Sequence, residues 1–461
     1  MENLIFDTTS NQIILSKMKL INSKKFKKKI HNLIPGGSHT YSKGDDQFPE
    51  LSPSAFIRGK GSYLWDLDNN KYLDCSMGLS SVTLGHAYPQ VIKGVAKELK
   101  KGTNFQRPSI KELEVAELFL EQIKFHDRIK FAKNGSTLTT AAVKLARAKT
   151  GRDLIAVPYD HPFYSYDDWF IGQTNCNKGI PKAVKDLTVT FKGCDLTSLE
   201  KLFKKYKNKI ACVITEPERP VCNTICDCKI PVKNFLKNAH NLTKKNGAIF
   251  ILDEMITGYK THFPGSSVKY NIKADLITWG KSISNGFSFS ALTGKKEIMD
   301  LGSIKKKQEK VFLISTTHGA ETHSIQAGIE TLKVFKSKKV VEYKKSIGDY
   351  FLKSIKNIIK ENKLEKYIKT VDCNWFPQVI FYDKNLKACD GLKTLVMQEM
   401  FKRKILFQGI LIPSLSHKKK NIDDLVESFD NVLQIYRKAI NKGYKKYLYG
   451  EKIKPVFRKI I

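Results

Sequence analysis

The chain has 461 residues, of which 41% are hydrophobic and 27% are charged. This length can bury a large core and favours one large domain with a smaller one. No uninterrupted apolar run reaches about 18 residues, and the N-terminus carries early acidic residues instead of a compact apolar segment with a cleavage site. We therefore expect neither a membrane span nor a signal peptide.

The chain is strongly basic, with 80 lysines and arginines against 45 acidic residues and a net charge of +35. Such a balance is typical of proteins that bind nucleic acids or anionic membranes. The lysines are spread along the whole chain, in short clusters such as Lys27–Lys29, Lys305–Lys307 and Lys418–Lys420, without an interleaved aromatic stripe. We interpret them as a solvated surface and expect no nucleic-acid partner.

The nine cysteines are scattered and odd in number, which favours a reducing, cytoplasmic compartment. Cys222, Cys226 and Cys228 have the spacing C-x3-C-x-C. A zinc site usually has paired C-x2-C spacing and needs a fourth ligand, which is not evident nearby. We expect no metal.

The N-terminal region begins with a basic arm, residues 1–33, which is expected to be helical or loosely ordered. Ile34–Gly37 then breaks the pattern. Phe56–Gly59, Tyr63–Asp66 and Lys71–Leu73 read as short antiparallel strands joined by polar turns.

A helix is predicted after Asn134, Gly135, Ser136 and Thr137, because apolar residues from Leu138 onward recur at helical spacing until Gly151. Small polar residues that open a helix leave free N–H groups at its positive end, which suits an anion. An ordinary helix cap needs the same residue types, so both interpretations stay open.

Three apolar runs then read as buried strands: Ile210–Ile214, Ala248–Leu252 and Leu276–Trp279. Each is followed within two residues by a charged side chain, and these are Glu216, Asp253 and Lys281. In an open α/β sheet, ligands bind beyond the carboxyl ends of parallel strands. Asp253 and Lys281 are therefore expected at the same edge of one sheet.

An acid and a lysine at such an edge are the two groups that a pyridoxal phosphate site requires. The lysine forms a Schiff base with the cofactor aldehyde, and the carboxylate pairs with the protonated pyridine nitrogen. The alternative is a surface aspartate with one of very many lysines.

Several segments resemble class III aminotransferases, and among them the glutamate-1-semialdehyde 2,1-aminomutase-like members. The likeness rests on LDEMITGYK around Asp253, ADLITWGKSISNGFSFSALTG around Lys281, IPGGSHTYSKG from Ile34, and Leu84–His86 with Pro89. It runs from about Ile34 to about Asp424 and covers most of the chain.

The resemblance implies an α/β fold, the pyridoxal-phosphate-dependent transferase fold (fold type I), with a mostly parallel central sheet and a smaller α+β domain. We expect an N-terminal arm and segment in residues 1–75, a large cofactor-binding domain in residues 76–325, and a small domain in residues 326–461. From Ile325 onward, helical patterns alternate with short strands such as Phe376–Phe381.

The resemblance also implies cofactor-binding residues. Gly135 and Ser136 match the phosphate-binding position, and Phe163 matches an aromatic residue that stacks on the pyridine ring. Many relatives have histidine at the position of Tyr164, so that role is not carried over. Met255, where relatives usually have valine, is expected to cover the other face of the ring.

Thr317 matches a threonine that reaches the cofactor phosphate of the neighbouring subunit. The site would then be complete only in a homodimer.

The substrate residues depart from the family pattern. Lys43 stands where the aminomutases use an arginine for the substrate carboxylate, and a lysine cannot make the same bidentate contact. Leu79 stands at a pocket tryptophan, and Glu216 matches a glutamate near the ring and the substrate.

We therefore expect a pyridoxal-phosphate-dependent aminotransferase or aminomutase that moves an amino group through Lys281. The alternative is a transaminase of a keto-sugar or another carbonyl compound in surface polysaccharide synthesis. Remoter alternatives are a decarboxylase or epimerase on the same fold, and a catalytically inactive, basic nucleic-acid-associated protein.

Overall fold

The computed structural model describes residues 20–161, 163–220, 232–304 and 309–454. Cys222, Cys226, Cys228 and Lys305–Lys307 lie outside these ranges. The chain divides into two units. Of the described residues, the first unit takes 20–77, 85–87 and 344–454, and the second takes those between 78 and 84 and between 88 and 343. The domain boundaries expected from the sequence stay a prediction.

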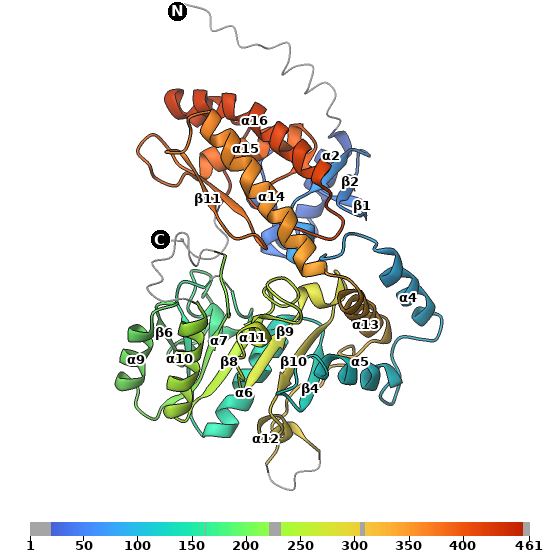
Figure 1. Cartoon of the computed structure of the whole chain (residues 1–461), viewed down its shortest axis with the longest axis vertical. Helices are drawn as coiled ribbons and strands as arrows, with labels where there is room; N and C mark the ends of the chain where they lie inside the picture. The colour runs from blue at the N-terminus through green and yellow to red at the C-terminus, as the bar shows by residue number, and fades with distance from the viewer. Residues whose placement is uncertain (1–19, 162, 221–231, 305–308, 455–461) are drawn as a thin grey trace, which may run out of the picture. The chain divides into compact units, whose positions relative to one another are not determined.

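The second unit is built on a seven-stranded sheet with the order β4-β10-β9-β8-β7-β5-β6 (Figure 1). The strands from β9 to β6 are parallel, and β10 is antiparallel to both of its neighbours. The strands are β4 (Arg128–Ala132), β5 (Leu154–Pro158), β6 (Thr188–Phe191), β7 (Ile210–Thr215), β8 (Ile249–Glu254), β9 (Leu276–Trp279) and β10 (Ser290–Gly294).

The three strands predicted from apolar runs are confirmed as β7, β8 and β9. Every residue of these strands is buried, which is why the runs are continuous and do not alternate. β8 extends two residues further than predicted, so Asp253 and Glu254 belong to the strand itself.

Helices complete the second unit. The predicted helix after Asn134 is confirmed as α6, and Gly151 ends it in the left-handed conformation with a φ of 64°. The helices are α4 (Pro89–Leu99), α5 (Ile110–Leu120), α6 (Gly135–Thr150), α7 (Asp168–Ile171), α8 (Lys182–Lys185), α9 (Leu196–Lys205), α10 (Val232–Lys245), α11 (Ser266–Lys269), α12 (Lys296–Met299) and α13 (Thr322–Ser337), with short 3-10 turns η4 (Lys281–Ser284) and η5 (Asp300–Gly302).

The first unit combines the N-terminal segment with the C-terminal part of the chain. The predicted antiparallel strands are confirmed as β1 (Phe56–Lys60), β2 (Tyr63–Asp66) and β3 (Lys71–Asp74), and β13 (Ile405–Leu406) pairs in parallel with β3. β11 (Ile368–Val371) and β12 (Gln378–Phe381) form a separate antiparallel pair. Its helical elements are α2 (Ile21–His31), most of α14 (Val340–Glu361), α15 (Asp390–Lys402), α16 (Lys419–Lys442), η1 (Pro35–Gly37), η2 (Tyr41–Lys43), η3 (Asp45–Gln47) and η6 (Tyr444–Tyr447).

A left-handed turn, α3 (Met77–Ser80), marks the point where the chain passes from the first unit to the second. Among the described residues, no helix is long and apolar enough to cross a membrane.

Candidate active site

Asp253 and Lys281 lie at the same edge of the central sheet, as the sequence predicts. β8 and β9 are parallel neighbours, with Asp253 paired to Thr278, and Lys281 follows the end of β9 by two residues. Asp253 is buried. Both hydrogen bonds that the described residues donate to its carboxylate end on Oδ1, from the Met255 N–H at 2.9 Å and from Thr278 Oγ1 at 3.0 Å. Oδ2 is therefore the atom that can meet a ligand.

Burial dominates the electrostatics of Asp253. It raises the pKa of this carboxyl from 3.8 to about 6, against the opposing effects of the Met255 N–H, Lys281 and Thr278. A cationic partner would stabilise the ionised form of this buried carboxyl group, because opposite charges attract.

The amine of Lys281 is less basic than that of an exposed lysine. Burial lowers the pKa of its ammonium group, while Asp253 and then Glu216 act in the opposite direction. The residue keeps partial solvent exposure, so a small molecule can reach it. Its φ of 50° lies in the left-handed region, which is uncommon outside glycine and is found at functional sites more often than elsewhere.

Met255 brings the lysine segment and the start of α6 together. A Cβ at Gly135 would lie 2.7 Å from Met255 Sδ, and a Cβ at Gly280 would lie 2.5 Å from the same atom. A side chain at either position would have to displace Met255. The side chain of Met255 therefore packs against the first residue of α6 and the residue before Lys281.

The N-terminus of α6 presents backbone amides of the kind that bind anions. The Asn134 side chain caps it by accepting a hydrogen bond from the Thr137 N–H at 3.0 Å. In the described part of the chain, the amides of Gly135 and Ser136 then stay available, because first-turn amides have no intrahelical acceptor. The Ser136 hydroxyl accepts a hydrogen bond from the Tyr166 N–H at 3.0 Å, which ties the aromatic segment to this helix.

The aromatic segment holds one exposed ring and one buried ring. Phe163 is 38% exposed and meets Phe170 edge-on, with 5.8 Å between ring centroids. Tyr164 is buried, and its hydroxyl is hydrogen-bonded to His161 Nδ1 and accepts from the Glu216 N–H at 3.2 Å. The Glu216 carboxylate lies 3.6 Å from His161, so the acid after β7 belongs to this buried cluster.

The left-handed turn carries Leu79, which is 38% exposed. Its residues Met77, Gly78, Leu79 and Ser80 have φ values of 45°, 60°, 54° and 64°. A left-handed conformation costs about 1–2 kcal/mol for each residue other than glycine. The Ser282 hydroxyl donates to the Ser80 carbonyl at 3.3 Å, so the turn contacts the residue next to Lys281.

Two of the residues implied by the resemblance are not among the contacts described above. Thr317 is exposed in a turn. Its backbone carbonyl accepts a hydrogen bond from the side-chain amide of Asn104 at 3.0 Å. Lys43 is exposed in the first unit, and the structure does not place it relative to Lys281.

Sequence reasoning missed three contributors to this edge. Nothing in the sequence around Thr278 indicates a functional role. A hydrogen-bond donor to a functional acid can, however, be sought at the residue that pairs with that acid on the neighbouring parallel strand. Ser282 follows the lysine but resembles any small helix residue. The left-handed turn is hinted at by Gly78 alone, since Met77 and Leu79 rarely adopt that conformation.

Metal binding has no support among the described residues, where groups of three or more potential protein ligands do not occur. The cysteine triplet at Cys222, Cys226 and Cys228 lies outside those residues, so the expectation that it binds no metal stays a prediction.

Comparison with known proteins places the chain in a family. The family model of class III aminotransferases covers residues 46–433. The glutamate-1-semialdehyde 2,1-aminomutase of Thermodesulfovibrio yellowstonii is 28% identical over 435 residues, which cover 89% of this chain and 98% of that protein. The enzyme of the same name from Wigglesworthia glossinidia brevipalpis is 29% identical over 433 residues, with 88% and 96% covered.

Solved structures share the fold. The FumI protein of Sphingopyxis sp. MTA144 superposes with a TM-score of 0.81 at 22% identity, covering 91% of this chain and 97% of that one. A glutamate-1-semialdehyde aminomutase from Pseudomonas aeruginosa PAO1 in complex with PMP superposes with a TM-score of 0.79 at 16% identity, with 93% and 98% covered. The predicted α/β transferase fold is thereby confirmed.

The residues at the sheet edge fit pyridoxal phosphate. The open Oδ2 of buried Asp253 suits a ring N–H, the Lys281 amine suits an aldehyde, and the free amides of Gly135 and Ser136 suit a phosphate. The family match extends over most of the chain and includes all of these residues. The chain therefore belongs to the class III aminotransferases, a family of pyridoxal-phosphate-dependent enzymes.

Proposed function

We propose that this protein is an aminotransferase or aminomutase in which Lys281 carries the proton and Asp253 controls the charge of the cofactor ring. The observation that supports it most strongly is that a buried carboxylate with one oxygen open and a half-buried amine of lowered pKa lie at the same sheet edge. Isolated surface charges would not show these opposite effects of burial.

The cofactor-binding roles follow from the surroundings of this pair. Asp253 would hold the ring nitrogen protonated, and the amides of Gly135 and Ser136 would bind the phosphate. Met255 packs beside both Gly135 and the residue before Lys281, so it is suited to cover one face of the ring. Phe163 has an exposed ring for the other face, because stacking uses the ring and needs no hydroxyl.

Bound pyridoxal phosphate supplies an aldehyde for the lysine and an aromatic ring that withdraws electrons from the substrate carbon. The chain supplies the proton transfer. Because burial lowers the pKa of the Lys281 ammonium group, more of the amine is free to remove the substrate proton near neutral pH and to return it at another atom. Glu216 and the Tyr164–His161 pair would orient polar groups of the substrate from the end of β7.

The substrate is proposed as a small amino compound with its carbonyl counterpart. The aminomutase relatives, which the chain matches over nearly their full length, support glutamate-1-semialdehyde or a close analogue. Lys43 and Leu79, in place of an arginine and a tryptophan, favour the second candidate, a transaminase of a keto-sugar or other carbonyl compound.

We further propose a homodimer in which Thr317 reaches the partner's cofactor phosphate. The exposure of Thr317 in the single chain supports this, since a residue that serves a neighbour must lie on the surface. The scattered cysteines of the sequence, odd in number, support a reducing, cytoplasmic compartment.

The test is chemical trapping. The purified chain is loaded with pyridoxal phosphate, reduced with borohydride, digested and mapped by mass spectrometry, beside Lys281→Ala. We expect the cofactor on Lys281 in the wild type and on no peptide of the variant. Wild-type protein that takes up no cofactor, or fixes it elsewhere, would contradict the proposal.

Steady-state kinetics then separate the two candidates. A mutase converts one compound without an added amino donor, whereas a transaminase shows ping-pong dependence on two substrates. The assay pairs glutamate-1-semialdehyde alone with a panel of amino donors and keto acceptors.

A further inference from the structure

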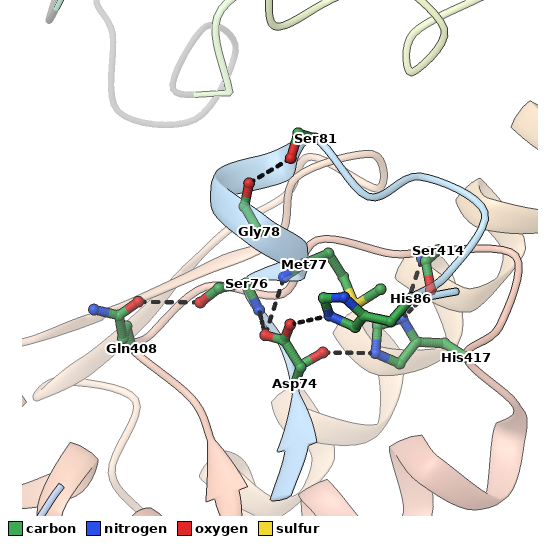
Figure 2. Close-up of polar contacts among 9 residues, drawn as sticks. All are labelled: Asp74, Ser76, Met77, Gly78, Ser81, His86, Gln408, Ser414 and His417. Carbon is green, nitrogen blue, oxygen red and sulfur yellow. Dashed lines mark hydrogen bonds and ion pairs between the residues drawn. The ribbon is translucent and has the colours of Figure 1, made fainter. Parts of the chain in front are cut away.

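A buried polar cluster in the first unit uses its hydrogen-bonding groups to hold its own backbone, as Figure 2 shows. Oδ1 of Asp74 accepts from the Ser76 N–H at 2.8 Å and from the Met77 N–H at 3.0 Å. His86 Nε2 lies 2.8 Å from Oδ2 of the same carboxylate, and His417 Nε2 donates to its backbone carbonyl at 3.0 Å. These contacts explain the cluster as a structural one.

The outer edge of β6 in the second unit differs, because its backbone groups are not used. β6 is the last strand of the sheet, and its partner is β5. The Phe191 carbonyl accepts a hydrogen bond from the N–H of Tyr159, directly after β5, at 2.9 Å. Successive residues of a strand direct their backbone groups to opposite sides, so Val189 also faces β5, whereas Thr188 and Thr190 face outward. Among the described residues, these outward N–H and C=O groups have no hydrogen-bond partner.

A groove of about 660 Å³ lies at this free edge. Its lining comes from β6, from α9, which packs beside β6 (Figure 1), and from the stretch between α7 and α8. Thr188 and Thr190 belong to the lining, together with Lys182 and Lys185 of α8 and Lys205 of α9. We call it the β6 edge groove.

Hydrogen bonds and close packing hold the walls of the β6 edge groove in place. The Thr188 hydroxyl donates to the Trp169 carbonyl at 2.6 Å, which ties β6 to α7. The Gln173 side-chain amide donates to the Lys185 carbonyl at 2.7 Å, and a Cβ at Gly172 would lie 3.0 Å from Lys185 Cγ. The groove is therefore preformed, which lowers the entropic cost of binding.

The lining of the groove is positively charged. Lys182 is paired with Asp186 at 2.5 Å. In the part of the chain that the structure describes, Lys185 and Lys205 form no ion pair, and Lys205 Nζ lies 5.1 Å from the ring centroid of Tyr206. Lysines beside a free strand edge disfavour pairing with the same edge of a second copy, because like charges repel. An acidic strand meets the opposite condition.

We propose that the β6 edge groove binds an extended acidic segment of a partner protein by strand addition. The outward backbone groups of Thr188 and Thr190 pair with the backbone of the added strand, and Lys185 and Lys205 meet its carboxylates. β7 and β5 stand between β6 and β8, so this surface is separate from the edge that carries Asp253. Its occupation does not depend on the proposed amino transfer.

The test measures binding of a fluorescein-labelled peptide, in which Glu and Val alternate, to the full chain by fluorescence anisotropy. We expect this peptide to bind and its counterpart with Lys in place of Glu to fail. A version with every backbone amide N-methylated keeps the carboxylates but cannot donate hydrogen bonds to the strand edge. It should bind about tenfold more weakly or worse.

Charge-reversal variants locate the binding site. Lys185→Glu combined with Lys205→Glu should weaken binding by about tenfold or more. The matched control combines Lys201→Glu with Lys204→Glu, which makes the same change in net charge at exposed positions of α9 outside the groove lining. It should leave the affinity within about twofold of the wild type.

Variants of Thr190 test the backbone contact. Thr190→Pro removes an outward N–H and keeps the hydrogen bonds between β6 and β5, since proline is tolerated where the N–H of an edge strand faces solvent. It should weaken binding by about fivefold, whereas Thr190→Val keeps the N–H and should stay within about twofold. Circular dichroism and thermal unfolding check the fold of each variant.

Several results would overturn the proposal: no binding of the acidic peptide, equal binding of the N-methylated version, or a loss of affinity that the control pair on α9 reproduces. Succinate that displaces the probe as well as unlabelled peptide does would make the groove a simple anion site. Self-association in sedimentation that Thr190→Pro abolishes would make a second copy of this chain the occupant. Both of these outcomes also contradict the acidic partner strand.

Discussion

The end of β8 presents two consecutive buried acids that differ in how their oxygens are used. Both carboxylate oxygens of Glu254 accept hydrogen bonds. Oε2 accepts from the Thr257 hydroxyl at 2.5 Å, and Oε1 accepts from the Ser267 N–H at 2.7 Å. Asp253 concentrates its two hydrogen bonds on Oδ1. Burial raises the pKa of both carboxyl groups, so burial alone does not separate them.

The comparison teaches that the open oxygen, rather than the shifted pKa, marks the functional acid. Glu254 holds the loop after β8 in place, and a Cβ at Gly265 would lie 2.7 Å from Glu254 Oε1. Asp253 lies close enough to Lys281 for the lysine charge to lower the pKa of its carboxyl. One acid is therefore expected to matter for stability and the other for chemistry.

The largest effect is expected from Lys281→Ala. Removing the amine removes both the covalent attachment point and the proton carrier, so amino transfer should fall by about 10⁴-fold or more. Single-turnover absorbance with a saturating amino donor measures it. Lys295→Ala, which removes a lysine paired with Asp275 away from this edge, serves as the control and should keep its activity.

Asp253→Asn should lower the rate of amino transfer by about 10³-fold, because a neutral amide cannot stabilise the charge of the ring nitrogen. The fold should survive, since an amide oxygen can still accept from Met255 and Thr278. Stopped-flow kinetics with circular dichroism check both statements. Near wild-type turnover in this variant would remove the distinction between the two acids.

The pH dependence of stability sharpens the same contrast. In the cofactor-free protein, the pKa of Asp253 is about 6 against 3.8 as a reference. Because the folded state binds this proton more tightly, its contribution to the free energy of unfolding is complete below about pH 4 and is lost as pH rises through about 6, a change of about 3 kcal/mol. Denaturant unfolding should show this loss in the wild type and not in Asp253→Asn.

Added pyridoxal phosphate should weaken that pH dependence, because a cation at Oδ2 lowers the pKa of Asp253. A wild-type profile identical to that of Asp253→Asn would contradict the assigned electrostatics.

The smallest effect is expected from Glu254→Gln. One oxygen that accepts a hydrogen bond becomes a donor, which should cost about 1–3 kcal/mol of unfolding free energy. Turnover per folded molecule should stay within about twofold of the wild type. A loss of turnover similar to that of Asp253→Asn would make Glu254 part of the chemistry.

The strands that carry this contrast could be predicted because β7, β8 and β9 are buried on both faces and read as continuous apolar runs. The charged residue after each run then predicts the sheet edge. β4 and β10 give no such signal, since RIKFA mixes charged and apolar residues and SALTG is short and small. The placement of Asp253 and Lys281 was therefore predictable, and strands β4 and β10 on one side of the sheet were not.

Contacts between distant segments could not be predicted. Nothing in Met77 or Leu79 indicates a left-handed turn, because both are residue types that rarely adopt that backbone. The grouping of Tyr164, His161 and Glu216 likewise depends on how two loops meet. Local propensity does not contain this information, and tertiary contacts override it.

The central account is tested most directly by the protonation state of the ring nitrogen, measured by ¹⁵N NMR with labelled pyridoxal phosphate bound to the wild type, Asp253→Asn and Glu254→Gln. We expect a protonated nitrogen in the wild type and in Glu254→Gln, and a neutral one in Asp253→Asn. A nitrogen that stays protonated without the Asp253 carboxylate, or that loses its proton in Glu254→Gln, would contradict the division between the two acids.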